Sequence, residues 1–398
     1  MLLSVTLIAY VCRYGSNVPL WDEYQNLPLL LGKVPVSWQN LNADWSEHRT
    51  PLLRLILLGL ARATGDDFRA PLFLSAALLI ATNFALLAAF KNQLNWEHAF
   101  IPLLLLHLRR SENLLQGWNL QNVLFAFFAC MELICLLKPT TWKTMLGAGL
   151  CLVGLALDGA GGVFVAGILS LWVVWRSPRF SVLAMLALGI ACYEWMQPRP
   201  NNPETSSNNP FAVAMGAIYF LTSNFGLFWP LATALLGLAL WRRWKLSGLA
   251  LFVFAMIGLA VGVSYRRSGI DPRYCFQMTR YMDLAAPLLI ALFVTEQRRW
   301  LRYAFLGVMI AAFPLQEWHG VQYASNLKPT CEMLEEDLRH PREVSPQDIV
   351  ASHPLIVPTW GKRPRTERNI ALTIEGIEAL RSSDWMKDRP RGSARDGS

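Results

Sequence analysis

Three uncharged, apolar stretches of bilayer-spanning length constrain this sequence more than any other feature. They cover residues 70–90, 211–240 and 246–264. A helix that crosses the hydrocarbon core of a bilayer needs about 20 such residues. The composition agrees, because 54% of the 398 residues are hydrophobic and only 16% are charged. The sequence therefore predicts an all-α polytopic membrane protein and excludes a soluble, collagen-like or disordered chain.

Further apolar segments bring the expected number of transmembrane helices to about eleven. Residues 144–175 are too long for one span and are interrupted at residues 158–162, which predicts two short helices joined by a Gly-rich turn. Residues 284–316 are divided by the charged segment 296–302, which predicts a helical hairpin. The other expected spans are residues 2–14, 98–108, 119–137 and 180–195.

The charged loops predict the orientation of these spans. Short basic loops, such as those containing Lys91 and Arg298, alternate with longer polar segments and are typical of the cytoplasmic side. With an odd number of spans, the N-terminus is then cytoplasmic and the C-terminus extracytoplasmic. We expect a transmembrane domain over residues 1–316, with a first outer loop at about residues 15–69 that carries interfacial helices. Residues 317–398 are expected to form a polar, partly disordered extracytoplasmic tail with one amphipathic helix near residues 366–385.

The net charge of +8 comes from basic residues scattered between apolar runs and not gathered in one domain. This pattern favours contact with membrane lipids, and no nucleic-acid partner is expected. The seven cysteines show no CxxC spacing, so the sequence supports neither a zinc site nor a disulfide framework.

An acidic pair, Asp22 and Glu23, follows the first expected span directly and lies in the first outer loop. A carboxylate at the membrane surface can accept a proton from an attacking hydroxyl. It can also bind a divalent cation, and an acidic pair in a loop can simply aid solvation. Because adjacent side chains diverge, we expect one of the two to face a site and the other to support it.

The same loop contains Glu47, His48 and Arg49, directly before a predicted interfacial helix that starts at Pro51 and is ended by Gly65. Its residues 52–64 are apolar, with Arg54 and Arg62 among them. The N–H groups at a helix N-terminus favour an anion, and the phosphate of a lipid carrier would fit there. The alternative is that Glu47 caps the helix and Arg49 contacts lipid headgroups.

A second set of basic residues lies between the predicted spans 246–264 and 284–316, on the outer side. It includes Arg273 and Arg280, the latter followed by Tyr281 at the start of a span. Outer arginines oppose the positive-inside tendency, and a phosphorylated substrate would explain them. Contact with lipid headgroups explains some of them equally well.

The acidic pair in a long first outer loop, followed by many spans, resembles the GT-C class of integral membrane glycosyltransferases. The likeness is to bacterial relatives of the protein mannosyltransferases and of the lipid-A aminoarabinose transferases. It rests on Asp22 and Glu23, on the Glu47–Arg49 block and on Arg280–Tyr281. The tail resembles no periplasmic domain of the class.

The resemblance implies an inverting glycosyltransferase in the inner membrane that uses a sugar on a polyprenyl phosphate. The acceptor would be a hydroxyl of a lipid, a glycan or a protein. Asp22 would be the base, with Glu23 as its alternate or support. His48, Arg49 and Arg280 would stabilise the leaving phosphate. The alternative function is a transporter or flippase for a lipid-linked or anionic solute, which would require polar residues and broken helices at mid-membrane.

Overall fold

The computed structural model describes residues 1–43, 49–197, 206–241, 247–269, 271–339, 344–353 and 367–383. Within these ranges the chain is helical and contains no β-strand, which confirms the all-α prediction. Four helical stretches in the described residues are long and apolar enough to cross a membrane, namely Ala70–Ala89, Gly117–Leu137, Pro210–Leu240 and Gly248–Arg267. The chain therefore has the character of a helical membrane protein, and the number of eleven spans stays a prediction.

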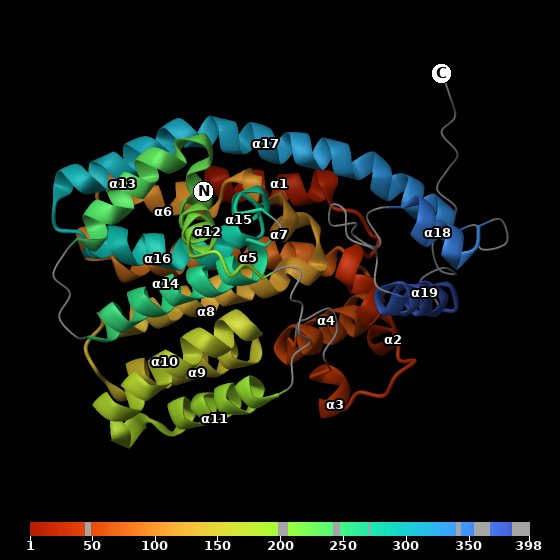
Figure 1. Cartoon of the computed structure of the whole chain (residues 1–398), viewed down its shortest axis with the longest axis horizontal. Helices are drawn as coiled ribbons and strands as arrows, with labels where there is room; N and C mark the ends of the chain where they lie inside the picture. Colours follow the sequence, from red (N-terminus) through yellow and green to blue (C-terminus); the bar gives the residue numbers. More distant parts are fainter. Residues whose placement is uncertain are drawn as a thin grey trace.

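The long helices lie side by side along one axis of the molecule (Figure 1). They include α1 (Leu2–Tyr14), α5 (Ala70–Ala89), α8 (Leu120–Leu137), α14 (Gly248–Arg267) and α16 (Tyr281–Thr295). Three shorter apolar helices, α9 (Trp142–Leu157), α10 (Ala160–Arg176) and α11 (Val182–Met196), pack together on one side of this bundle. The turn between α9 and α10 contains Gly159 at φ 116°, so the predicted break at residues 158–162 is confirmed.

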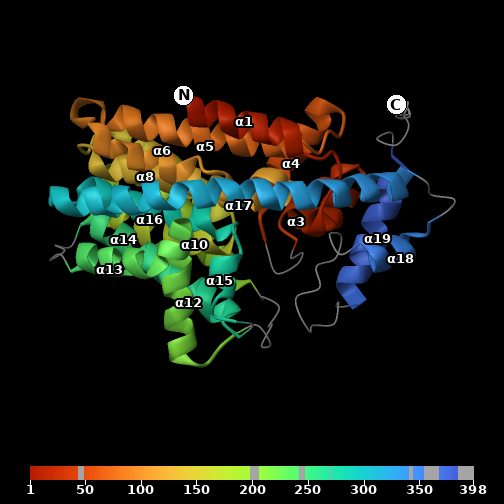
Figure 2. The same ribbon diagram turned by 90° about the horizontal axis from the view of Figure 1, so that it is seen from above.

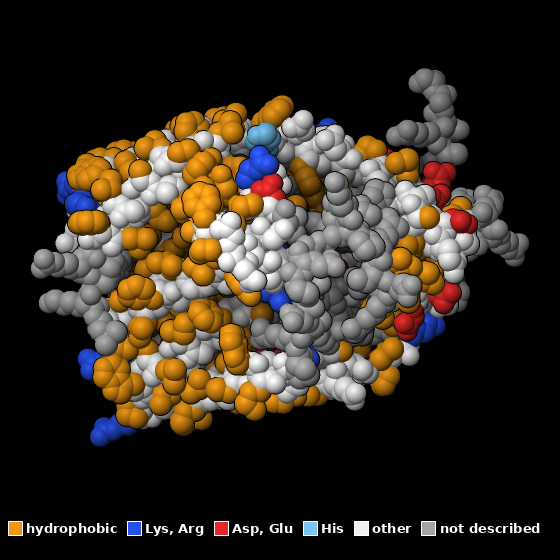
Figure 3. Space-filling model, viewed as in Figure 1, with side chains coloured by type: hydrophobic (Ala, Val, Ile, Leu, Met, Phe, Trp, Pro, Cys, Tyr) orange, Lys and Arg blue, Asp and Glu red, His pale blue; other side chains and the backbone are white. Residues whose placement is uncertain are grey.

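The outer surface of the bundle is apolar. Figure 3 shows hydrophobic side chains spread over the helices, with several Lys and Arg at the left end and most of the visible Asp and Glu at the right. Large aromatic side chains such as Trp175 (69% exposed) and Trp241 (87% exposed) lie at helix ends on this surface. An apolar band with tryptophans at its edges is the surface expected of a protein in a bilayer.

The segment 211–240, predicted as one span, is broken. It forms α12 (Pro210–Thr222), a 3₁₀ turn at Ser223–Phe228 (η7) and α13 (Trp229–Leu240). Gly226 has φ 56°, a conformation that glycine adopts without steric cost. Figure 2 shows α13 parallel to the bundle axis and α12 running across it. The apolar pattern could not reveal this bend, because both halves are equally hydrophobic.

The segment 98–108 is also not one regular helix. It contains α6 (Phe100–Leu105), only six residues long, between the 3₁₀ turns η3 (Trp96–Ala99) and η4 (Leu108–Arg110). A six-residue α-helix is about 9 Å long, far less than the bilayer core. The single spanning helix predicted over residues 98–108 is therefore absent, and a short helix between two 3₁₀ turns takes its place.

The hairpin predicted in the segment 284–316 is present, between α16 and α17 (Arg299–Arg339). The 41 residues of α17 continue without interruption through residue 316, where the sequence suggested that the tail begins. The first part of the tail is thus an extension of the bundle. Two further helices follow, α18 (Pro346–Ser352) and α19 (Glu367–Arg381), the second of which matches an amphipathic helix expected near residues 366–385.

The segment expected to form the first outer loop is largely helical. It contains η1 (Trp21–Asn26), α2 (Leu27–Leu30), α3 (Trp38–Leu41) and α4 (Pro51–Thr64). As predicted, α4 begins with Pro51 and ends at Gly65, which is left-handed at φ 63°. Arg54, expected on an interfacial surface, is instead fully buried, and it donates to the carbonyl oxygens of Leu41 and Ala43 at 2.7 and 2.6 Å.

Candidate functional site

The acidic pair lies on the short 3₁₀ helix η1, at the end of the bundle that carries the first loop. Trp21, the residue before Asp22, has φ 49°. This left-handed conformation costs a non-glycine residue about 1–2 kcal/mol, so the surrounding packing holds the backbone there. Asp22 is partly exposed, and Glu23 is buried.

Glu23 is bound by the protein itself. Its Oε2 accepts the backbone N–H of Leu20 at 2.6 Å, and its Oε1 accepts that of Trp118 at 2.8 Å. Burial raises the pKa of Glu23 from 4.5 to about 7, although hydrogen bonds from Leu20, Trp118 and Gly117 oppose this rise. Glu23 therefore joins the first loop to the residues just before α8, and both of its carboxylate oxygens accept backbone hydrogen bonds.

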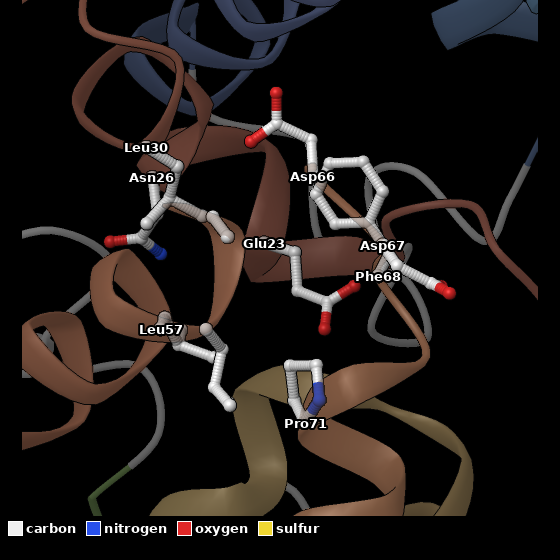
Figure 4. Close-up of a pocket in the computed structure, with 10 residues that line it drawn as sticks. Glu23, Asn26, Leu30, Leu57, Asp66, Asp67, Phe68 and Pro71 are labelled. Carbon is white, nitrogen blue, oxygen red and sulfur yellow. The ribbon is translucent and has the colours of Figure 1, made fainter. Parts of the chain in front are cut away.

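A small pocket lies beside Glu23, between η1, α4 and the start of α5 (Figure 4). Figure 4 shows the Glu23 carboxyl group in the middle of the pocket, with Asp66 and Asp67 pointing away from it. The cavity is about 20 Å³, which is enough for a water molecule and too small for a sugar.

Arg280 lies at the N-terminus of α16, between groups from distant parts of the chain. It donates from Nη2 to the Tyr274 hydroxyl at 3.0 Å and lies 5.5 Å from the ring centre of Tyr281. Burial alone would lower the pKa of Arg280, but surrounding groups more than offset this and raise the pKa above its usual value. In order of decreasing effect these groups are Tyr281, Tyr274, Glu112 and Asp22.

Two of those groups are carboxylates, and each comes from an element far from Arg280 in the sequence. Glu112 lies on α7 (Ser111–Leu115), and its Oε2 also accepts the backbone N–H of Arg280 at 2.9 Å. Asp22 comes from η1. The structure thus brings Asp22 within electrostatic range of Arg280. The sequence analysis proposed these two residues as parts of one site.

The other predicted site residues are placed differently. Arg273 is exposed in the loop before α15 (Tyr274–Gln277) and pairs with Asp271 at 3.0 Å. Arg49 lies beside the α9–α10 turn. Its backbone carbonyl oxygen is close to Gly159, at 3.5 Å from the position that a Cβ would occupy there. Glu47 and His48 lie outside the described residues. Tyr281 is buried, and its ring packs 5.9 Å from that of Phe220.

A buried polar network behind this site was not predicted from the sequence as a connected unit. Arg110 forms an ion pair with Asp283, and neither side chain is exposed. Asn113 donates to Asp283, and Arg110 also donates to Asn224 Oδ1 at 3.0 Å. Asn224 in turn donates to the carbonyl oxygen of Met282 at 2.9 Å. The network ties η4, α7, η7 and α16 together, and polar residues at the edges of apolar runs were its only sequence signal.

Arg109, adjacent to Arg110, has a different environment. Its guanidinium lies 5.0 Å from the ring centre of Phe276, and its Nη1 is 3.5 Å from Gln316 Oε1. Among the described residues no carboxylate forms an ion pair with it. Burial lowers the pKa of Arg109 to about 10, so the side chain remains charged at neutral pH.

The donor set for a metal ion is limited. Within the described ranges, no group of three or more His, Cys, Asp or Glu side chains is arranged to hold one. Comparisons of this chain with protein-family models, with curated proteins and with solved structures gave no match.

Proposed function

We propose that the chain is a membrane glycosyltransferase that moves a sugar from a polyprenyl-phosphate donor to an acceptor hydroxyl at the outer face of the inner membrane. The observation that carries the proposal is the approach of Asp22 to Arg280 across the first loop and α16. Such a site offers a base for the acceptor and a cation for the leaving phosphate, which are the two groups that the reaction needs.

The roles within the acidic pair follow from burial. Asp22 is the partly exposed member, and so it is the base that accepts the proton of the acceptor hydroxyl. Glu23 has both carboxylate oxygens on backbone N–H groups and therefore positions η1. The strained backbone at Trp21 supports this assignment, because such strain is concentrated at functional sites.

The test is transfer from a radiolabelled polyprenyl-phosphate sugar in membranes that contain the chain. Asp22→Asn should lower the transfer rate by about 10²- to 10⁴-fold, the usual contribution of a general base. Asp271→Asn is the matched control, because Asp271 is an outer carboxylate in a local surface pair with Arg273. Full activity of Asp22→Asn would refute the assignment of the base.

A transporter or flippase is the second candidate, and two observations favour it. The apolar segment 210–240 is broken at Gly226 beside the buried Asn224, as helices at transporter sites are. Glu132 on α8 is fully buried, and neither carboxylate oxygen has a hydrogen-bond partner among the described residues. Movement of a labelled lipid-linked sugar across liposomes without transfer to an acceptor would support this function over the first.

A further inference from the structure

The surroundings of Arg109 carry an inference beyond the site at Asp22. The side chain projects from η4, which packs against α17. Phe276 lies under the guanidinium, and the Phe276 ring is 5.9 Å from Tyr219, which is 4.8 Å from Trp229. A guanidinium stacked on an aromatic cluster keeps its N–H edge available for a ligand.

Among the described residues, no carboxylate is paired with Arg109. Asp283 is taken by Arg110, and Glu317 on α17 accepts the backbone N–H of Leu108 at 2.9 Å. Of the five N–H donors of Arg109, one has a described acceptor, Gln316 Oε1, at the long distance of 3.5 Å. A partly buried cation in this state is costly unless an anion completes it.

The backbone makes room for the guanidinium. Gly226 is left-handed at φ 56°, and a Cβ at this position would lie 2.7 Å from Arg109 Nη1 and 3.2 Å from Gln316 Nε2. His319, one turn further along α17, is close enough that burial and the charge of Arg109 together lower the pKa of its imidazole. Gly226 and Gln316 thus pack against the guanidinium, and His319 lies within its electrostatic range.

Large apolar side chains are exposed beside this cluster. Trp318 is 59% exposed and Leu227 is 70% exposed. A free phosphate makes no favourable contact with exposed apolar side chains, whereas the acyl or prenyl chains of a lipid cover them. Arginine is also the side chain best suited to bind a phosphate with two parallel hydrogen bonds.

We propose that Arg109, positioned by Gln316 and with His319 nearby, binds the phosphate group of a membrane lipid at the outer end of the bundle. Two lipids present the same chemistry, a bilayer phospholipid and a polyprenyl phosphate. The second source rests on the proposed glycosyltransferase function, and the first is independent of it.

The experiment is native mass spectrometry of the full chain in detergent, titrated separately with phosphatidylglycerol and with polyprenyl phosphate. Arg109→Gln should weaken binding by roughly 10- to 100-fold, the loss expected for hydrogen bonds to a charged group. Arg298→Gln is the matched control, because Arg298 lies in the α16–α17 hairpin and pairs with its own carboxylate, Glu296, at 2.8 Å. The Arg298→Gln variant should bind both lipids as tightly as the wild type.

Two further variants keep the result interpretable. Arg109→Lys retains the charge and should bind the lipids more tightly than Arg109→Gln. His319 is exposed, so His319→Gln should leave folding unchanged and weaken lipid binding less than Arg109→Gln does. If Arg109→Gln loses binding of both lipids, the site is a general lipid site. If it loses binding of polyprenyl phosphate alone, the site binds the donor or the product of the reaction. Wild-type affinity of a folded Arg109→Gln for both lipids would overturn the proposal. Because binding is measured without turnover, lipid binding can persist even if Asp22→Asn shows that the transferase assignment is wrong.

Discussion

The acidic pair in the first loop and the basic pair at η4 are both formed by adjacent residues of like charge, yet the members of each pair differ. Glu23 and Arg110 are buried and bound by the protein, through backbone N–H groups and through Asp283 respectively. Asp22 and Arg109 are only partly buried. Adjacent side chains point in different directions, so packing can bury one charge inside the fold and place its neighbour nearer the surface.

The largest effect is expected where a committed charge loses its partner. Asp283→Leu leaves Arg110 buried without its countercharge and should lower the free energy of unfolding by about 3–5 kcal/mol. The measurement is chemical unfolding of the purified chain in detergent. The double variant Arg110→Leu/Asp283→Leu removes both charges and should recover most of the loss. Unchanged stability of Asp283→Leu would show that the pair does not distinguish Arg110 from Arg109.

The committed carboxylate should make stability depend on pH. The pKa of Glu23 is raised to about 7 in the folded chain, from 4.5, so the folded state favours the protonated form. Its stabilising effect is complete below about pH 4.5 and is lost as the pH rises through 7, a change of about 3 kcal/mol. Unfolding measured from pH 4.5 to pH 8 should show this decline in the wild type. The decline should be smaller in Glu23→Gln, and equal slopes would contradict the buried position of Glu23.

The helix α19 should influence the acidic pair through packing. A Cβ at Gly376 would lie 2.1 Å from the carbonyl oxygen of Tyr24, so Gly376→Ala must push α19 away from η1. We expect a loss of about 1–3 kcal/mol and faster proteolysis of the tail. Gly307→Ala in α17 is the control, because a Cβ there meets nothing within 4 Å. Equal protease sensitivity of the two variants would mean that α19 does not hold η1.

The smallest effect is expected for an arginine that belongs to neither group. Arg273 forms an exposed pair with Asp271, and exposed pairs contribute little. Arg273→Gln should leave both lipid binding and sugar transfer unchanged, whereas Arg280→Gln should lower the rate of transfer. A clear loss of transfer in Arg273→Gln would return this residue to the phosphate-binding set that the sequence suggested.

The apolar runs by themselves determined the helical class and several boundaries. The helices α1 and α5, the turn at Gly159 and the hairpin before α17 follow from local features, namely run length, a Gly-rich interruption and a charged segment. The sequence also indicated Asp22 and Arg280 as candidates, because charges are rare next to apolar runs. Each of these signals depends on residues close together in the chain.

Only the tertiary structure decided which of these charges meet and which are committed. Three contacts join residues that are distant in the sequence. They are the ion pair between Arg110 and Asp283, the hydrogen bond from the Trp118 N–H to Glu23, and the approach of Asp22 to Arg280. The bend at Gly226 also lies in a run that is apolar on both sides. Hydrophobic periodicity reports only whether a segment is buried in lipid or protein. The partner of a buried charge is selected by how the helices pack, because an uncompensated charge inside a bundle is too costly to leave unpaired.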